Sequence, residues 1–378
     1  MVSPAMSIAA ASRLEGKTIL QVLPALEAGG VERGTLEIAA ALRKAGARAL
    51  VVSSGGRMAA SLGADHIVMP VHTKTPVGLW RNAGRLKALI TREGVDLVHA
   101  RSRAPAWSAR AAARRASVPF VTTFHGAYGA RSAAKRAWNR IMGRGDRVIA
   151  VSEFISGHMQ EVYRCPPERI RVVHRGIDAA TFDPAAVPPR KRAALRAAWG
   201  VPEDARIVLL PGRLTRLKGH AVLIEAIRLL ADPNLVAVFA GSDRGRDAYR
   251  RELETQAQGL AVRFVGHVDD VAAVYAASDV AVSASVQPES FGRVLAEACA
   301  MGLPVVASDH GGAREIVRQG ETGWLVPPGD PAALAEGICC ALAASGPGLA
   351  TCARAHVLGR FTLARMCAGI LAVYDELL

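Results

Sequence analysis

The sequence predicts an α/β protein with two doubly wound, parallel-sheet domains. Its 378 residues exceed the ~100–200 residues that one ordinary domain uses. Short apolar segments alternate with helical segments through both halves, a pattern typical of parallel sheets covered by helices. Residues 181–196, with Pro184, Pro188 and Pro189 before a basic stretch, interrupt this alternation and are expected to form a linker.

The amino-terminal half begins with an expected strand at residues 18–23. Gly29 and Gly30 follow it and lead into an expected helix, although two adjacent glycines by themselves indicate only a turn. A later strand, residues 121–124, ends beside His125. A single histidine is more often structural than catalytic, so the local pattern alone assigns His125 no role.

In the carboxyl-terminal half, the order strand, loop and helix occurs twice with polar residues in the loop. Residues 207–210 are an expected strand, followed by a loop at 211–219 and a helix from 220 to 230. Residues 279–283 are another apolar strand, and the segment 291–301 has helical composition. Because ligands in open α/β sheets lie at the carboxyl ends of strands, the two loops are the candidates for a site.

Two carboxylates lie in the second loop and its helix. Glu289 is in the loop, and Glu297 is about two turns into the helix, roughly 10 Å along its axis. A helix does not pair its own first N–H groups, so those of Phe291, Gly292 and Arg293 are expected to be available at the helix start, where the helix dipole favours an anion. This geometry suits a diphosphate with a sugar on one side and a ribose on the other, although two solvated carboxylates are the commoner outcome.

Two cations lie in the first loop. Arg213 and Lys218 are bounded by Gly212 and Gly219, and both side chains suit phosphate oxygens. The loop is not a P-loop, because no Ser or Thr follows Lys218 and the glycine spacing differs. Surface Arg and Lys are common, so only the combination with the two carboxylates indicates a site.

The order and spacing of these pieces resemble the retaining GT-B glycosyltransferases, which include sucrose synthase and many bacterial envelope-glycan transferases. The resemblance covers essentially the whole chain. It implies two Rossmann-like domains facing across a cleft, with 1–180 binding the acceptor, 197–360 binding the nucleotide sugar and the last helix, 361–378, packing back on the first domain. The residues that carry it are Gly212-Arg213-Leu214, Lys218-Gly219, Gly266-His267-Val268, Pro288-Glu289-Ser290-Phe291-Gly292 and Glu297-Ala298.

The resemblance also implies roles for single residues. Glu289 would hold hydroxyl groups of the donor sugar, which His125 would also contact, and Arg213 and Lys218 would stabilise the departing diphosphate. The family retains the anomeric configuration, so front-face attack is expected. Glu297 would bind the ribose. The further donor contacts expected are Gly29, Gly30, Gly212, His267, Val268, Phe291, Gly292 and Arg293.

No metal or other cofactor is expected beside the nucleotide-diphosphate sugar. Asp269 and Asp270 are adjacent rather than spaced as Asp-x-Asp, and the two cations with the helix start would replace a metal ion. The six cysteines include no Cys-x-x-Cys and are typical of buried apolar residues in a reducing compartment.

Positive charge is concentrated in the amino-terminal half. Residues 1–183 hold 27 Lys and Arg against 13 Asp and Glu, whereas 184–378 hold 20 of each. Between Arg101 and Arg147 eleven basic residues meet one acid, Asp146. Such a cluster favours an anionic partner, which we expect to be an anionic membrane surface or a charged glycolipid. Nucleic acid is not expected, since no motif for its recognition accompanies the charge.

The same region resembles transferases of bacterial lipopolysaccharide core or other envelope glycolipids. The expected acceptor is therefore a membrane-bound, negatively charged glycolipid. No segment approaches the ~20 apolar residues that cross a bilayer, and residues 1–16 are expected to be a disordered leader. We expect a cytoplasmic protein that docks reversibly on the inner face of the plasma membrane. The expected acceptor contacts are Arg101, Arg103, Tyr128, Arg131 and Lys135.

Two alternatives stay open. A sugar-nucleotide 2-epimerase of the same fold would bind the donor but need no acceptor, which the basic amino-terminal half disfavours. A non-catalytic nucleotide-binding scaffold would be free to lose the motif residues that this chain keeps. A dehydrogenase is disfavoured, because no Gly-x-Gly-x-x-Gly follows a strand.

Overall fold

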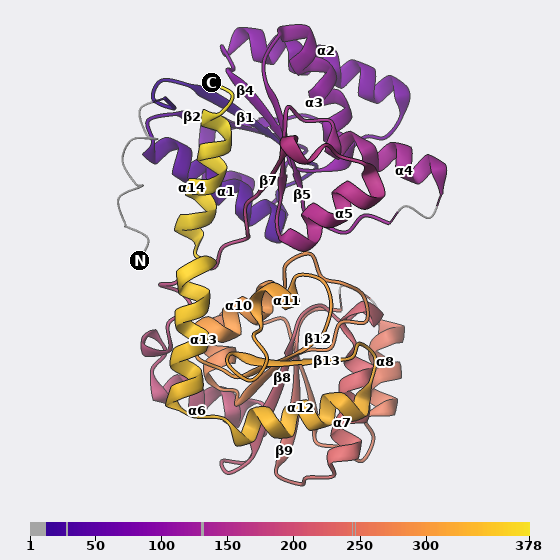
Figure 1. The fold of residues 1–378 in the computed structure, drawn as a ribbon, viewed down its shortest axis with the longest axis vertical. Helices are drawn as coiled ribbons and strands as arrows, with labels where there is room; N and C mark the ends of the chain where they lie inside the picture. Colours follow the sequence, from indigo (N-terminus) through magenta and orange to yellow (C-terminus); the bar gives the residue numbers. More distant parts are fainter. Residues whose placement is uncertain (1–12, 28, 130–131, 244, 246) are drawn as a thin grey trace. The chain divides into compact units, whose positions relative to one another are not determined.

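The computed structural model describes residues 13–27, 29–129, 132–243, 245 and 247–378. It divides into two compact units: unit 1, which runs up to His174 and takes back Ala364–Leu378, and unit 2, Arg175–Leu363. Each unit has one parallel sheet with helices on both faces (Figure 1). These are the two Rossmann-like domains of the GT-B fold, as the sequence predicted.

The sheet of unit 1 has the strand order β3-β2-β1-β4-β5-β6-β7, and all its neighbouring strands are parallel. The order reverses between β1 and β4, and α/β proteins bind ligands outside the carboxyl ends of strands at such a reversal. The strands are Thr18–Val22 (β1), Arg48–Ser53 (β2), His66–Val68 (β3), Leu97–Ala100 (β4), Phe120–Phe124 (β5), Arg147–Ala150 (β6) and Ile170–Val172 (β7).

Helices α1 to α5 and the last helix, α14, belong to unit 1. The hydroxyl of Tyr374, on α14, lies 2.7 Å from Nδ1 of His99 on β4, so the chain's end packs directly on this sheet. The second ring nitrogen of His99 lies 2.7 Å from Oγ1 of Thr123 on β5. The helices are Gly30–Lys44 (α1), Pro76–Arg92 (α2), Arg103–Ala116 (α3), Ala133–Asn139 (α4), Glu153–Tyr163 (α5) and Leu363–Asp375 (α14).

The sheet of unit 2 has the order β10-β9-β8-β11-β12-β13, again with parallel neighbours. Its strands are Arg206–Pro211 (β8), Leu235–Ala240 (β9), Val262–Gly266 (β10), Val280–Ser283 (β11), Val305–Ser308 (β12) and Gly323–Val326 (β13). Its helices are Pro189–Ala198 (α6), His220–Leu230 (α7), Asp247–Gln256 (α8), Val271–Ala276 (α9), Arg293–Ala300 (α10), Ala313–Ile316 (α11), Pro331–Ala343 (α12) and Pro347–Arg360 (α13). Short 3₁₀ turns lie at Ala59–Asp65, Arg140–Gly143, Pro167–Arg169, Pro184–Ala186 and Arg216–Lys218.

Strand β8 shows how both faces of this sheet are buried. Ile207 and Leu209 belong to one apolar cluster, and Val208 and Leu210 belong to a second cluster on the other face. All four side chains have no exposed surface. Because alternate residues of a strand point to opposite faces, an unbroken apolar run is what a sheet covered on both sides requires.

The segment expected as a linker is partly helical. Helix α6 begins at Pro189, where proline fits because the first helical N–H needs no partner. Leu195 and Trp199 pack against the core of unit 2. The sequence pattern treated the prolines only as breaks, whereas the structure places the division between units earlier, after His174.

Among the described helices, none is by itself long and apolar enough to cross a membrane. Helices α12 and α13 pass that test only as a pair bent by 108°.

Candidate active site

A polar cluster lies in unit 2 at the carboxyl ends of β8 and β11, which are neighbours in the sheet. Nζ of Lys218 donates to Oε1 of Glu289 at 2.7 Å. Ser283, the last residue of β11, donates to the same oxygen at 3.2 Å, and the hydroxyl of Ser285 also donates to it. Oε1 of Glu289 therefore accepts hydrogen bonds from one cation and two hydroxyl groups.

These contacts keep Glu289 ionised. Burial alone would raise the pKa of the Glu289 carboxyl, but the charge of Lys218 and the hydrogen bonds from Lys218, Ser285 and Ser283 outweigh it and hold the pKa below its ordinary value. The Lys218 and Glu289 side chains are still 24% and 20% exposed. Within the described residues no donor bonds Oε2 of Glu289, which leaves that oxygen for a hydroxyl group of a ligand.

The backbone holds the two loops together. The N–H of Val286 donates to the carbonyl of Leu217 at 2.9 Å. Gly219 has a φ of 70°, and a Cβ at this position would lie 1.8 Å from the carbonyl oxygen of Ala284. Glycine is required here, because a side chain would separate the loop that carries Lys218 from the loop that carries Glu289.

The remaining predicted residues of the first loop lie beside Lys218. A Cβ at Gly212, whose φ is 146°, would lie 3.5 Å from Cε of Lys218. Arg213 is exposed, and it has no hydrogen-bond or ion-pair partner among the residues that the structure describes. Leu214 is buried and anchors the loop in the core. The Arg213 guanidinium is therefore free to meet an anion.

The second predicted carboxylate is held inside helix α10. Gly292 precedes this helix with a left-handed φ of 92°. Glu297 is only 7% exposed. Its Oε1 lies 2.9 Å from Nε of Arg293, and its Oε2 accepts a hydrogen bond from the hydroxyl of Tyr275 at 3.1 Å. A ribose hydroxyl at Oε1 would therefore compete with Arg293.

Phe291, also predicted at the start of α10, contributes to packing. Its side chain is buried, and its ring centroid lies 5.4 Å from that of Phe361. Its backbone is held close to Gly312, where a Cβ would lie 2.5 Å from the Phe291 carbonyl oxygen. The aromatic ring thus fixes the loop, and only the backbone of Phe291 is suited to face a ligand.

The sequence analysis missed a third segment at this place, residues 308–312, which begins with the last residue of β12. The N–H of Gly312 donates to the carbonyl of Glu289 at 2.9 Å. Gly311 lies so close to Glu289 that a Cβ there would be 2.5 Å from the same oxygen. The available signal was this glycine pair, which begins three residues after the end of an apolar strand. A small pocket here is lined by Ser283, Ser285, Glu289, Gly292, Leu295, Ser308, His310 and Ala313.

Two of the predicted donor contacts, His267 and Val268, lie elsewhere in unit 2. His267 and Val268 follow β10, which is separated from β8 by β9 in the sheet. The His267 ring is exposed, with Nε2 at 3.2 Å from Oδ1 of Asp269, and Val268 packs against the core. No group of three or more side chains suited to a metal ion occurs in the described ranges.

In unit 1 the predicted residues lie after three different strands. Helix α1 begins at Gly30, with Gly29 before it in extended backbone at φ 172°. His125 follows β5 and is partly buried. The ring of Tyr128 lies 4.6 Å from that of Phe124, and the Arg103 guanidinium lies 4.3 Å from the Tyr128 ring centroid. Arg103 and Tyr128, both predicted to contact the acceptor, therefore contact each other.

The remaining acceptor predictions have different outcomes. Arg101 is only 2% exposed, and its Nη1 donates to Oε1 of Gln21 at 3.2 Å, so a contact between Arg101 and the acceptor stays a prediction. Burial lowers the pKa of Arg101. Lys135 is exposed on α4. Arg131 lies outside the described residues.

Comparison with known families gives a consistent result for both units. The family model described as "Glycosyl transferases group 1" matches residues 191–347, and the one described as "Glycosyltransferase Family 4" matches residues 28–181. The chain belongs to the group 1 glycosyltransferases. It is therefore a transferase enzyme, and the resemblance inferred from the motif residues is confirmed.

Individual relatives extend this match. The chain is 35% identical over 308 residues to a D-inositol 3-phosphate glycosyltransferase of Geodermatophilus obscurus, covering 74% of this chain and 66% of that protein. The crystal structure of a glycosyltransferase from Rickettsia africae is 34% identical, with a TM-score of 0.88 over 96% of this chain and 98% of that one. Anabaena Alr3699/HepE, in complex with UDP and glucose, is 26% identical, with a TM-score of 0.83 over 96% and 100%.

Proposed function

We propose that this glycosyltransferase moves a hexosyl group from a UDP- or GDP-linked sugar to an acceptor hydroxyl, with retention of anomeric configuration and without a metal ion. The Lys218–Glu289 pair is the observation that carries the proposal. It offers a fixed carboxylate to sugar hydroxyls and a cation to the adjacent diphosphate. The relative that binds UDP and glucose supports the same class of donor.

The chain's cations would act on the leaving group. Lys218 is held by Glu289 before any ligand binds, and exposed Arg213 lies on the same loop. Donors that are already in place where charge develops give large contributions to rate, because they need no reorganisation during the reaction. The start of α10, after Gly292, adds backbone N–H groups and a favourable dipole.

Retention would proceed by attack on the same face as the leaving group. Oε1 of Glu289 is already engaged by three donors, which makes this carboxylate a poor covalent nucleophile. In the proposed step the bond from the anomeric carbon to the diphosphate oxygen breaks and the bond to the acceptor oxygen forms. The acceptor's proton passes to the departing phosphate, so charge and atoms balance.

The acceptor proposed is a hydroxyl compound that carries phosphate. The excess of positive charge in residues 1–183 supports an anionic acceptor. Relatives named D-inositol 3-phosphate glycosyltransferase support a soluble phosphate ester. The lipopolysaccharide-core type of glycolipid predicted from the sequence carries the same kind of charge and is the membrane-bound form of this proposal.

For the membrane-bound form we propose a cytoplasmic protein that docks on the inner face of the plasma membrane. Val77 and Trp80 on α2 are 59% and 69% exposed, and Arg81 and Arg85 on the same helix are exposed. Exposed apolar side chains beside cations suit an anionic lipid surface. Sedimentation with phosphatidylglycerol and phosphatidylcholine vesicles tests this, and equal binding to both at moderate salt would reject it.

A thermal-shift panel of UDP, GDP, ADP, CMP and their sugar conjugates, with metal and with chelator, tests the donor proposal. A nucleotide at 100 times its Kd should stabilise the fold by ~2.7 kcal/mol. We expect one diphosphate series to raise Tm equally in chelator. NMR of the transfer product then gives the anomeric configuration.

Three other outcomes would reject the proposal in different ways. A shift that needs metal rejects the metal-free site. A C2 epimer formed without acceptor indicates an epimerase. Nucleotide binding without any turnover indicates a scaffold.

A further inference from the structure

His220 is a buried titratable residue that the proposed reaction does not use. It is the first residue of α7 and follows Lys218 by two positions, with Gly219 between them in left-handed backbone at φ 70°. Its side chain has no exposed surface. The chain therefore places an imidazole inside unit 2, at the end of the loop that carries Lys218.

Aromatic side chains pack on this imidazole. The centroid of the His220 ring lies 5.1 Å from that of Phe239 on β9 and 6.5 Å from that of Tyr249 on α8, both in edge contacts. Phe239 is fully buried and Tyr249 almost so. Such surroundings suit an aromatic hydrocarbon ring at least as well as an imidazole. Packing alone therefore does not account for the two ring nitrogens.

Both nitrogens of the His220 ring are buried without a hydrogen-bond partner among the residues that the structure describes. A buried polar group without a partner destabilises a fold. Burial, with a smaller contribution from the charge of Lys218, lowers the pKa of His220 to about 4. At neutral pH the ring is therefore uncharged, with one N–H donor and one acceptor nitrogen.

The carbonyl of Thr215 is the natural acceptor for that donor. It acts against burial and raises the pKa of His220, although neither ring nitrogen forms a hydrogen bond in this structure. The same carbonyl accepts the N–H of Lys218 at 3.0 Å and so closes the 3₁₀ turn Arg216–Lys218. A small movement of this turn would complete the hydrogen bond from His220 and would move Lys218 with it.

We propose that His220 is a positioning residue for Lys218, and that its ring N–H donates to the Thr215 carbonyl when the turn closes on a bound diphosphate. The proposal rests on the proposed function, since His220 acts through the cation assigned to the diphosphate. The unpaired ring then weakens the ligand-free fold and stabilises only the closed turn. An interaction made only in the closed turn contributes to turnover rather than to the stability of the free protein.

Replacing the ring separates this role from packing. His220→Phe keeps an aromatic ring against Phe239 and Tyr249 but removes the N–H, so Tm should stay unchanged or rise. Meanwhile kcat should fall by about 3- to 10-fold, the effect of one hydrogen bond. His220→Asn and His220→Gln place an amide N–H near the position of one ring nitrogen or the other, and at least one of them should restore kcat.

His356→Phe is the matched control. His356, on α13 of unit 2, is also buried and its Nε2 also has no partner among the described residues. This variant should keep kcat within about twofold of the unchanged protein. If His220→Phe lowers Tm and kcat together and neither amide variant restores kcat, His220 serves only the fold and the proposal is overturned.

A double-mutant cycle tests whether His220 acts through Lys218. In a protein that already carries Lys218→Ala, adding His220→Phe should lower kcat by less than about twofold, because the cation to be positioned is gone. Full additivity of the two losses overturns the proposal and leaves the role of Lys218 intact. Near-normal turnover in Lys218→Ala alone rejects the diphosphate assignment on which the proposal rests.

Nuclear magnetic resonance of protein labelled with ¹⁵N in its histidines gives a readout that needs no turnover. The signals of the His220 ring are those that His220→Phe lacks. UDP, GDP or inorganic pyrophosphate should shift the ring N–H signal in the unchanged protein but not in Lys218→Ala. If the signal shifts but no sugar nucleotide gives transfer, the proposed function fails and the positioning role survives. If a diphosphate binds and the signal does not move, the proposal is overturned and the proposed function stands. If none of the three binds, both fail.

Discussion

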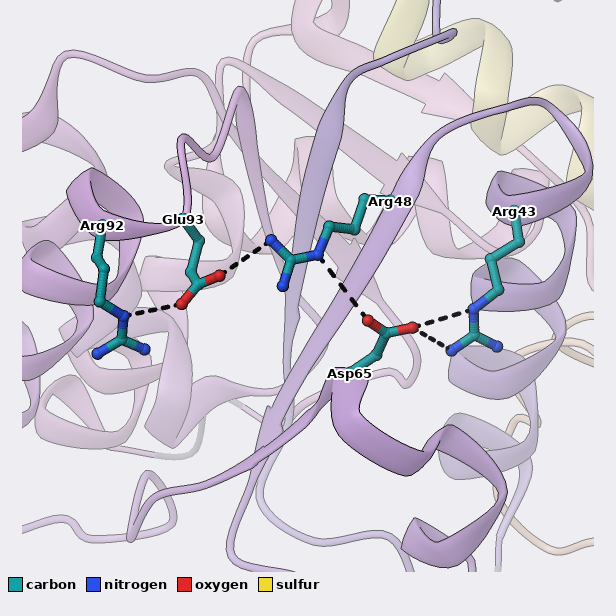
Figure 2. A network of polar contacts seen from close by, with 5 residues as sticks. All are labelled: Arg43, Arg48, Asp65, Arg92 and Glu93. Atoms are coloured by element: carbon teal, nitrogen blue, oxygen red, sulfur yellow. Dashed lines mark hydrogen bonds and ion pairs between the residues drawn. The ribbon is translucent and has the colours of Figure 1, made fainter.

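The two ends of the sheet in unit 1 differ in whether their charged side chains form ion pairs. Near the amino ends of its strands, Arg43, Asp65, Arg48, Glu93 and Arg92 alternate in one chain of contacts (Figure 2). The N–O distances along that chain are 2.8, 4.0, 2.9 and 2.8 Å. At the carboxyl ends, a pocket in unit 1, here called the basic pocket, is lined by Lys74, Arg103 and Lys135, and these cations have no carboxylate partner among the described residues.

Cations that are paired with carboxylates contribute to the fold, whereas cations without such a partner are available to a ligand. Hydrogen bonds from Arg92 and Arg48 lower the pKa of Glu93, and each arginine in the chain of contacts lies beside a carboxylate. In the basic pocket, Lys74 and Lys135 have no such partner among the residues that the structure describes. In unit 2, Lys218 and Glu289 combine both properties, because they pair with each other while remaining partly exposed.

The largest effect should follow from removing the cation of the Lys218–Glu289 pair. Lys218→Ala leaves the diphosphate without a fixed cation, and losing one preset donor of this kind commonly costs ~2.7–4 kcal/mol of transition-state stabilisation. Steady-state kinetics should show kcat falling by about 100- to 1,000-fold. Arg216→Ala, on the same loop but paired with exposed Glu252, is the matched control. Near-normal turnover in Lys218→Ala would break the assignment of this pair to the diphosphate.

A smaller effect should appear in the acid dependence of stability. Because folding lowers the pKa of Glu289 from 4.5, its ionisation stabilises the fold at neutral pH, and this contribution is lost as pH falls through the lowered value. The difference in melting temperature between the unchanged protein and Glu289→Gln should therefore shrink below about pH 4.5. In Lys218→Ala the burial of Glu289 is no longer opposed by Lys218, so the contribution of Glu289 ionisation to stability, and its loss in acid, should both be smaller. A difference that does not change with pH would contradict this pairing.

The smallest effect should distinguish the two ends of the unit 1 sheet. Arg48→Gln removes the middle of the contact chain and should lower Tm by about 1–2 °C, since exposed ion pairs contribute little. The loss should shrink in 1 M salt, where exposed charges are screened. Lys74→Gln should leave Tm unchanged or raise it slightly, because it relieves repulsion within the basic pocket. A larger loss in Lys74→Gln than in Arg48→Gln would reverse the comparison.

The sequence predicted the elements around the site well where the apolar pattern was strong. The expected helix at 220–230 is α7, and the expected strands at 207–210 and 279–283 differ from β8 and β11 by one residue at their ends. Contacts between segments that are distant in the sequence were harder to predict. His310, which follows β12, joins the Glu289 pocket because β11 and β12 are neighbours in the sheet, which spacing alone does not reveal.

Arg101 shows a different limit of the sequence pattern. An arginine in a basic run is ordinarily a surface residue, yet Gln21, on the neighbouring strand β1, gives Arg101 a buried partner. The cost of burying a charge depends on such partners, and they come from segments far apart in the sequence. The basic run correctly placed positive charge in unit 1 but did not show which side chains face outward.

If Glu289 holds the donor sugar as proposed, the close backbone contacts around it limit how the sugar preference can be redesigned. Residues 217–219, 284–291 and 311–312 meet at distances that leave no room for side chains at Gly219, Gly311 or Gly312. A loop transplanted from a relative would therefore have to bring all three segments together, or it would displace the carboxylate it was meant to reposition. Substitutions at Ser283, Ser285 and His310 alter the lining of the pocket and leave this backbone frame unchanged.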